Sequence, residues 1–495
     1  MFVVVRADAS IHLGTGHVAR SVALGLALRR VGARTLFLCA SGPGNQLGWV
    51  RDQGFDAVEL DTKLPDGPEP WRVDAEADAE STCDALNRLG QKPDWIVVDH
   101  YGLDALWERR VCQRGTRLLA IDDLGNRTHA SDSLVDPNLQ PDAARYDGVL
   151  DPRCRRMIGP RYALLRPEFR RGATRPPSRP RRVLACMGGT DPHDALGTVL
   201  DAWALLPQAR PRLDIVVGAG SPNVLSLCQR CALLPDVELH VQTSKMARLM
   251  AQADLMVGSA GGVSWERCCA GLPSVMATTA DNQRANLAAL ARARTGIAIG
   301  EWQRVGPVPL AKLLQELIER PSLLARMSAR AVALVDGRGA ERVAVHMASA
   351  WVKVRPAAPD DAAGAWVWRN AESTRRHFHD AAPVPLPQHM SWWQRTLADP
   401  QRELLVAEIG SLPVGIVRLD HADDSSTTSI YLDPALVGVG LGPQVLRAVQ
   451  RHVRAASQPR PLRAEILATN TASQRGFERA GFSRQGDYWI WEPKQ

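Results

Sequence analysis

The sequence predicts an α/β protein with two doubly wound domains in tandem, followed by a smaller α+β domain. Two long regions alternate short apolar runs with amphipathic helical patterns, a proline-rich segment separates them, and the pattern changes near residue 352. A chain of 495 residues is long enough for several domains, each with its own core. We therefore expect domains at 1–172, 173–351 and 352–495.

The first region contains four segments that each hold a short apolar run. They are FVVVRAD (2–8), RTLFLCA (34–40), DWIVVDH (94–100) and RLLAIDD (117–123). Helical patterns, for example at 18–30 and 75–89, separate them. Apolar strands separated by helices are typical of a parallel sheet covered on both faces. The segment at 170–180 holds three prolines and no apolar periodicity, so we expect it to connect two domains.

The same alternation restarts after this connection, from RVLACMGG (182–189) to GIAIG (296–300), and we expect a cleft between the two domains. From Val352 onward the apolar segments 403–410, 414–421 and 427–434 follow one another with only short turns. This spacing predicts an antiparallel meander. A helix at about 442–456, a strand at 462–469, a short helix and a strand at 487–493 complete the α+β domain.

Composition favours a soluble protein of the reducing cytoplasm. The net charge is +7, but arginines and acidic residues are interspersed, so we expect neither nucleic acid nor membrane as a partner. The N-terminus lacks the layout of a signal peptide, and no apolar stretch approaches the length of a membrane span. The nine cysteines are scattered, and we expect no disulfide framework and no metal.

The turn GTGH (14–17) follows the first predicted strand and opens a helix. Gly14, Thr15 and Gly16 offer backbone N–H groups to a ligand there. The turn lacks the third glycine of the dinucleotide fingerprint, and no acidic residue ends the next strand, which disfavours NAD. His17 lies at the carboxyl end of the first strand, where doubly wound sheets bind ligands. A neutral imidazole there suits a general base.

Two further glycine-rich loops follow predicted strands of the second domain, MGGTDPHDA (187–195) and GSAGGVSWERCCAGLPSV (258–275). Small residues let the backbone approach a ligand closely, so these loops predict a phosphate or diphosphate site. The candidate residues are Gly188, Gly189, Ser259, Gly261 and Gly262. Glu266 is a candidate acceptor for ribose hydroxyls, and Asn282 and Gln283 lie on a third loop at the same sheet edge.

The chain contains four motifs, in order RADASIHLGTGHVARS (6–21), VVDHYGLD (97–104), GGTDP (188–192) and the run from GSAGG to ADNQ (258–283). Together they resemble the UDP-sugar hydrolases of pseudaminic acid biosynthesis. This family is related in fold to the GT-B glycosyltransferases, and the resemblance covers residues 1 to about 350. It implies a GT-B-like pair of Rossmann-like domains.

The resemblance also implies a reaction and residue roles. The reaction is cleavage of UDP-2,4-diacetamido-2,4,6-trideoxy-β-L-altropyranose by water, giving UDP and the free sugar with inversion. His17 is then the general base, Tyr101 belongs to the sugar pocket, Glu266 to the ribose and Asn282 to the diphosphate-sugar region. UDP is a good leaving group, so no carboxylic acid is needed to protonate it.

The last domain has a glycine turn between a predicted strand and a helix, within LDPALVGVGLGPQVLRAVQRHV (432–453). Successive N–H groups in such a turn form an anion nest suited to a pyrophosphate. This turn, followed by EILATNTASQRGFERAGF (465–482), resembles the GNAT acetyltransferases, which bind acetyl-CoA. The implied acetyl-CoA residues are Leu432, Gly438, Val439, Gly440, Gly442, Asn470, Ser473 and Phe477.

The stretch from WRNAESTRRHFHD to HMSWW (368–393) is similar to the acetyltransferase of the same sugar pathway. The resemblance implies N-acetylation of a UDP-4-amino-sugar, whose product the hydrolase consumes, and it makes other pathway enzymes candidate partners. Trp392 and Trp393 are expected in the core.

Two positions depart from the GNAT pattern. Val437 stands where the family often has Arg or Gln, and Phe477 stands where many members have a tyrosine that protonates the departing thiolate. Phenylalanine cannot donate a proton, so water, Ser473 or Tyr488 would take that role.

Two alternatives remain at this point. One is a GT-B glycosyltransferase that passes a UDP-sugar to an acceptor other than water and carries an acyltransferase of unknown amine substrate. The other is a non-catalytic nucleotide-sugar sensor with a nucleic-acid-binding surface, which the lack of a basic helix or an aromatic-basic platform disfavours.

Overall fold

A computed structural model describes residues 1–493, apart from 66, 68, 70, 140–142, 171–179, 190 and 192. The predicted interdomain connection therefore lies almost wholly outside the described residues, as does part of the GGTDP motif. Contacts divide the chain into two compact units, one of residues 2–27 and 34–340, the other of residues 1, 28–33 and 341–495. In these described residues, no helix is both long enough and apolar enough to span a membrane.

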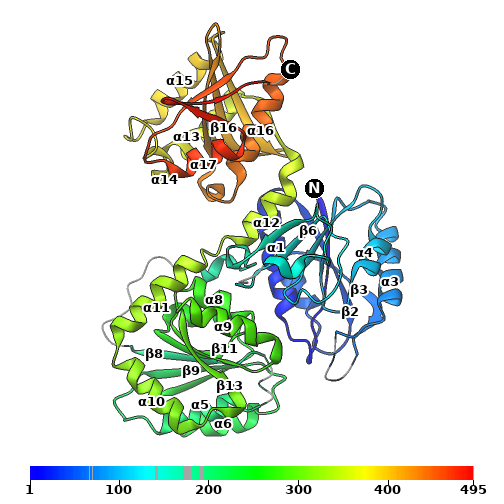
Figure 1. The fold of residues 1–495 in the computed structure, drawn as a ribbon, viewed down its shortest axis with the longest axis vertical. Coiled ribbons are helices and arrows are strands. Elements are labelled where there is room, and N and C mark those ends of the chain that lie inside the picture. The colour runs from blue at the N-terminus through cyan, green and yellow to red at the C-terminus, as the bar shows by residue number, and fades with distance from the viewer. Residues whose placement is uncertain are drawn as a thin grey trace. The chain divides into compact units, whose positions relative to one another are not determined.

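The first sheet, in the blue to cyan part of the chain in Figure 1, is parallel throughout and has the strand order β3-β2-β1-β4-β5-β6-β7. Its strands are β1 (Phe2–Ala7), β2 (Arg34–Ser41), β3 (Asp56–Lys63), β4 (Trp95–Asp99), β5 (Arg117–Ile121), β6 (Ser133–Asp136) and β7 (Arg155–Ile158). Its helices are α1 (Gly16–Arg30), α2 (Leu47–Asp52), α3 (Ala75–Arg88) and α4 (Ala105–Val111). The strand order reverses between β1 and β4, and such a switch point is where open α/β sheets bind ligands.

Burial explains why these segments become strands. Every residue of β1 and β4 is buried, as expected for strands covered on both faces. Helix α3 begins where the Asp74 carboxylate accepts hydrogen bonds from the N–H groups of Glu76 and Ala77. The sequence pattern indicates four of the seven strands. It misses β6 and β7, which have only four residues each, and β3, whose residues are mostly not buried.

The second sheet is also parallel, with the order β10-β9-β8-β11-β12-β13. Its strands are β8 (Arg182–Cys186), β9 (Arg212–Val217), β10 (Val237–Val241), β11 (Leu255–Ser259), β12 (Ser274–Thr278) and β13 (Gly296–Glu301). Its helices are α5 (Ala195–Ala204), α6 (Val224–Ala232), α7 (Met246–Gln252), α8 (Val263–Cys269), α9 (Arg284–Arg292), α10 (Pro307–Ile318) and α11 (Pro321–Leu334). Helices α5, α6 and α10 build the core on one face, and α7, α8 and α9 build the core on the other. The order reverses between β8 and β11.

The third sheet is mixed, with the order β14-β15-β16-β17-β18-β20-β19. Its strands are β14 (Val352–Pro356), β15 (Arg402–Ile409), β16 (Leu412–His421), β17 (Ser426–Leu432), β18 (Leu462–Glu465), β19 (Ser483–Gln485) and β20 (Tyr488–Trp491). Strands β15 to β17 form the expected antiparallel meander, and β14, which the sequence pattern does not predict, pairs antiparallel with β15. The helices of this part are α12 (Gly339–Met347), α13 (Ala362–Asn370), α14 (Glu372–Arg375), α15 (Leu386–Leu397), α16 (Leu441–Arg454) and α17 (Thr471–Arg479).

Strands β17 and β18 pair in parallel over only two positions, Ser426 with Leu462 and Thr427 with Arg463. Beyond these two pairs no ladder joins them in the described structure, so the strands part toward the end of β17. Trp393 is fully buried in the core of this domain, which confirms the expectation for that residue, whereas Trp392 packs against the core only in part.

Candidate functional site

His17 and Asp99 form a buried pair at the switch point of the first sheet. His17 is the second residue of α1, which follows β1, and Asp99 is the last residue of the neighbouring β4. The His17 Nδ1 atom lies 2.6 Å from Asp99 Oδ1. Both residues are buried, with His17 6% exposed and Asp99 fully enclosed.

A guanidinium keeps the Asp99 carboxyl ionised. Arg20, one turn after His17, donates from Nε and Nη2 to the two Asp99 oxygens, at 2.6 Å each. Burial alone would raise the pKa of Asp99, but Arg20 and His17 together hold that pKa well below its usual range. An ionised carboxylate only accepts hydrogen bonds, so the His17 Nδ1 atom donates to Asp99, and the lone pair of a neutral imidazole is then on Nε2. The pair thus prepares an imidazole that can take a proton at Nε2.

Tyr101 closes one side of the imidazole. Its ring meets the His17 ring edge to face, with centroids 4.5 Å apart and an interplanar angle of 81°. The Tyr101 hydroxyl hydrogen-bonds Asp123, and burial together with Asp123 raises the pKa of that hydroxyl well above its usual value, so it stays protonated. Asp123 Oδ2 also lies 3.2 Å from Arg20 Nη1. One carboxylate therefore ties Tyr101 to the cation that holds Asp99.

The turn before His17 depends on a glycine. Gly14 has a φ of 76°, in the left-handed region that side chains disfavour, and its N–H donates to Ser10 O at 2.9 Å. The Thr15 carbonyl accepts from the Ala19 N–H at 2.9 Å, and Gly16 begins α1. The turn therefore fixes the direction in which His17 enters the helix.

In the second sheet, the loop after β8 lies against the loop after β9. Gly188 has a φ of 105°, and the Gly218 N–H donates to Gly189 O at 2.9 Å. A Cβ at Gly218 would lie 2.2 Å from that oxygen, so this close approach requires glycine. Gly188 and Gly189 are both exposed at the carboxyl edge of the sheet.

The loop after β11 is joined to the segment after β12. A Cβ built at Gly261 would lie 3.4 Å from Gln283 Nε2, so these two predicted site residues are brought together. Gln283 Oε1 accepts from the Thr279 N–H at 3.1 Å, and Asn286 Nδ2 donates to Ala260 O at 2.6 Å. Asn282 is exposed beside Gln283, and Gly262 is exposed ahead of α8.

Glu266 carries a carboxyl group with a raised pKa. Burial raises this pKa from 4.5 to about 7, Arg166 opposes the shift and Glu168 adds to it. No other described residue forms a hydrogen bond or ion pair with this carboxylate. The group is therefore available to accept hydrogen bonds from a ligand.

The glycine turn of the third sheet leads into the 14-residue helix α16. Gly438 and Gly440 have φ values of 82° and 94°, and Gly440 is the residue before the helix. A Cβ at Gly442 would lie 3.9 Å from Leu432 Cδ1, so the turn folds back over the end of β17. Val439 is buried at 3% exposure and anchors the turn. Backbone N–H groups at the start of such a helix favour an anion.

The downstream GNAT candidates lie on and around α17. Asn470 caps the helix, accepting the Ser473 N–H at 3.1 Å. Phe477 is buried and meets Phe482 with ring centroids 4.9 Å apart. Tyr488 is exposed, with the Arg463 guanidinium 4.4 Å from its ring centroid. Val437 is also exposed.

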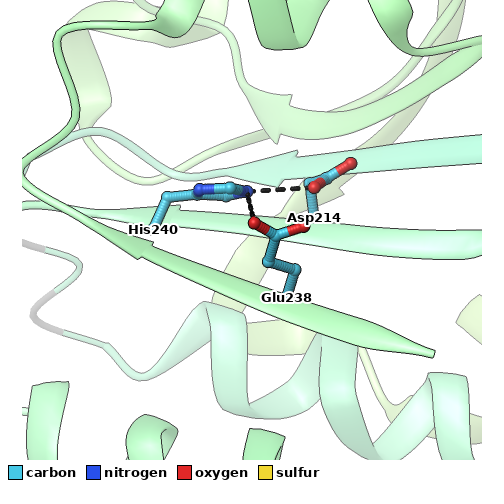
Figure 2. Close-up of side chains that lie close together, drawn as sticks. All are labelled: Asp214, Glu238 and His240. Carbon is cyan, nitrogen blue, oxygen red and sulfur yellow. Dashed lines mark hydrogen bonds and ion pairs between the residues drawn. The ribbon is translucent and has the colours of Figure 1, made fainter. Parts of the chain in front are cut away.

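Asp214, Glu238 and His240 form a compact group on β9 and β10 (Figure 2). His240 Nε2 lies 3.0 Å from Asp214 Oδ1 and 3.8 Å from Glu238 Oε1. Arg182 Nε lies 2.5 Å from Asp214 Oδ2, and Arg182 Nη2 lies 3.6 Å from Glu238 Oε2. These residue types bind metals, but the guanidinium already supplies a positive charge to both carboxylates. We assign the group as an ion-pair network.

Two of the nine cysteines are only three positions apart, although the cysteines as a whole are scattered along the chain. Cys228 and Cys231 form a C-x-x-C sequence on α6, and both are free thiols. Cys228 is exposed, whereas Cys231 is buried among the apolar side chains of the core. Burial raises the pKa of the Cys231 thiol, which disfavours the thiolate that binds metals or attacks disulfides.

Sequence reasoning missed three residues around His17. Asp99 lies within the quoted VVDHYGLD motif, from which only Tyr101 had been selected. Arg20 is three residues after His17 and so lies on the same face of α1. Asp123 follows β5, the strand next to β4. The signal in each case was a charged residue at the carboxyl end of a strand or one helical turn from the histidine.

Comparisons with known proteins agree with this architecture. Residues 352–483 match the family model described as "Acetyltransferase (GNAT) domain". The chain is 25% identical over 265 residues to the "UDP-2,4-diacetamido-2,4,6-trideoxy-beta-L-altropyranose hydrolase" of Campylobacter jejuni, covering 53% of this chain and 86% of that protein. It is 28% identical over 189 residues to the "Spore coat polysaccharide biosynthesis protein SpsG" of Bacillus subtilis, covering 37% and 56%.

Among solved structures, the "Glycotransferase of kitacinnamycin" aligns with a TM-score of 0.52 and 18% identity, over 70% of this chain and 98% of that chain. This likeness concerns the fold. The chain thus joins a GT-B-like pair of Rossmann-like domains to a C-terminal GNAT acetyltransferase domain.

Proposed function

We propose that the first two sheets hydrolyse UDP-2,4-diacetamido-2,4,6-trideoxy-β-L-altropyranose to UDP and the free sugar with inversion. We further propose that the GNAT domain uses acetyl-CoA to acetylate the 4-amino group of the UDP-amino-sugar that precedes it. The buried His17–Asp99 pair carries the first proposal. The Campylobacter jejuni relative supports the substrate class, and the matched acetyltransferase family supports acetyl-CoA.

In the proposed hydrolysis, His17 activates water. Nε2 takes a proton from water while the water oxygen bonds to the anomeric carbon and the bond from that carbon to the UDP oxygen breaks. The electron pair of the broken bond leaves on the diphosphate. Asp99 stabilises the imidazolium that forms, as a carboxylate does in a histidine-based triad. Attack opposite the leaving group inverts the anomeric configuration.

The glycine loops of the second sheet are the proposed UDP site. Gly188, Gly189, Ser259, Gly261 and Gly262 would bring backbone groups to the diphosphate, together with Asn282 and Gln283. Glu266 would accept hydrogen bonds from the ribose hydroxyls, because no other described residue occupies its carboxylate. Tyr101 would contact the sugar, since its ring already borders His17.

In the proposed acetyl transfer, the neutral amine of the sugar attacks the thioester carbonyl carbon. The carbon–sulfur bond then breaks, coenzyme A leaves as a thiolate, and the nitrogen that attacked gives its extra proton to water. The turn of Gly438, Gly440 and Gly442 would hold the pyrophosphate ahead of α16. A backbone N–H of β17 would polarise the carbonyl, where this strand has parted from β18. Phe477 cannot protonate the thiolate, which leaves water, Ser473 or Tyr488 for that step.

A released-sugar assay without added acceptor tests the hydrolase proposal. Wild-type protein should release UDP and free sugar from the diacetamido substrate, and His17→Ala should abolish this release while acetylation of the amino-sugar continues. His12→Ala is a matched control, because His12 is an exposed histidine of the same turn. Intact substrate with the wild type, followed by turnover once an acceptor sugar or lipid is added, would identify a glycosyltransferase instead.

A further inference from the structure

Arg267 on α8 is a fully buried cation that pairs with no carboxylate among the described residues. It is 1% exposed. The other arginine that is buried among the described residues, Arg6, contacts Asp8 and Asp78. Among the residues that the structure describes, Arg267 forms no ion pair with a carboxylate. A buried charge that lacks an opposite charge is costly to a fold, so its retention calls for a reason.

The guanidinium of Arg267 spans the glycine loop after β11. Its Nη1 atom donates to Ser259 O at 2.8 Å, and its Nη2 atom donates to Ser264 Oγ at 3.1 Å. Ser259 ends β11, and Ser264 lies in the first turn of α8. The loop between them contains Gly261 and Gly262, two of the residues proposed for the UDP site. One side chain therefore fixes both ends of that loop from inside.

The charge of Arg267 is not neutralised by its surroundings. Burial lowers its pKa to about 10, which still leaves the guanidinium protonated at neutral pH. The ionisable groups that act on it are the thiols of Cys268 and Cys186, whose pKa values burial raises to about 11. Both thiols are thus uncharged at neutral pH. A net positive charge lies directly beneath the loop.

We propose that Arg267 is a positioning residue for the anionic part of a nucleotide ligand. Its side chain sets the shape of the 260–263 loop, and its unpaired charge is balanced when the phosphates of the ligand bind above that loop. The proposal rests on the proposed UDP site and adds to it a residue that does not touch the ligand. It predicts that the site discriminates between a nucleoside diphosphate and the uncharged nucleoside.

Calorimetric titration of the full-length protein with UDP and with uridine tests this proposal. We expect Arg267→Met to weaken UDP binding by about tenfold or more, the effect of one unit charge at roughly 10 Å with an effective dielectric constant near 20. Uridine binding should change by less than about threefold. Arg267→Lys, which keeps the charge, should retain most of the UDP affinity. Arg292→Met removes the same charge at an exposed position of α9 and should leave both affinities unchanged.

The outcomes separate the inference from the proposed function. A wild type that binds neither ligand contradicts the UDP site itself. If the wild type binds UDP and Arg267→Met weakens the binding of UDP and of uridine equally, Arg267 is a purely structural clamp. That result overturns the electrostatic role. If circular dichroism shows Arg267→Met to be unfolded, Arg267→Gln and Arg267→Lys are compared. The proposal then requires the lysine variant alone to keep the preference for UDP.

Discussion

Replacement of Asp99 by asparagine tests the proposed base most sharply, because the change keeps the shape of the side chain. The amide has no negative charge, and its NH2 group would donate to His17 Nδ1. The proton of the imidazole then moves to Nε2, which can no longer accept one from water. The Arg20 cation, which now donates to both Asp99 oxygens, would also lose its main counter-charge.

The structure gives an order of magnitude for this loss. With the two charge centres about 4 Å apart and an effective dielectric constant near 20, the carboxylate stabilises the imidazolium by about 4 kcal/mol. Loss of that stabilisation corresponds to about a thousandfold in kcat for UDP release. The assay follows UDP release at saturating substrate, with acetyl transfer by the same preparation as the control for folding.

The companion variant Asp123→Asn leaves the 2.6 Å contact between His17 and Asp99 in place. Its kcat for UDP release should fall only about tenfold, because the change disturbs Tyr101 and one contact of Arg20. A kcat for Asp99→Asn within tenfold of wild type, with the fold intact, would refute the assignment of His17 as a base oriented by Asp99.

Four further expectations concern Glu266, Gly440 and Tyr101. Uridine affinity should rise between pH 6 and pH 8 as Glu266, with a pKa of about 7, ionises and accepts from the ribose, and titrations of Glu266→Gln should lack this rise. Because the pKa of Glu266 is 4.5 in the unfolded chain and about 7 in the fold, the contribution of Glu266 to the free energy of unfolding is largest below pH 4.5 and is lost as pH rises through 7. In urea unfolding, the stability of Glu266→Gln relative to the wild type should therefore increase toward pH 8. Gly440→Ala forces a side chain into a φ of 94°, and should cost about 1–2 kcal/mol in chemical denaturation while raising the KM for acetyl-CoA more than it changes kcat. Tyr101→Phe keeps the edge-to-face contact with His17 but loses the bond to Asp123, so kcat for UDP release should fall less than in Tyr101→Ala; equal losses would contradict a role for the ring contact.

The architecture was accessible from the sequence because it depends on local patterns. Apolar runs such as β1 and β4 are buried along their whole length, as expected for strands covered on both faces. Strand β3 was missed because it lies at the edge of its sheet and alternates without a clear apolar run. The change to an antiparallel meander was visible in the short turns between β15, β16 and β17.

The candidate site was accessible only in part. His17 could be selected because a glycine turn after a first strand has a predictable place in a doubly wound sheet. Its partner Asp99 lies 82 residues away, and only the pairing of β1 with β4 brings the two together. Arg267 gave no signal at all, because whether an arginine is buried without a counter-charge depends on the packing of every element around it.

We propose that one chain acetylates a UDP-amino-sugar and then hydrolyses the product through His17. A proton NMR time course on the 4-amino UDP-sugar, with and without acetyl-CoA, tests it directly. We predict that acetyl-CoA leads first to the N-acetylated UDP-sugar and then to UDP with the free sugar in the inverted anomeric configuration. Release of UDP at the same rate without acetyl-CoA, or a retained configuration, would contradict the account.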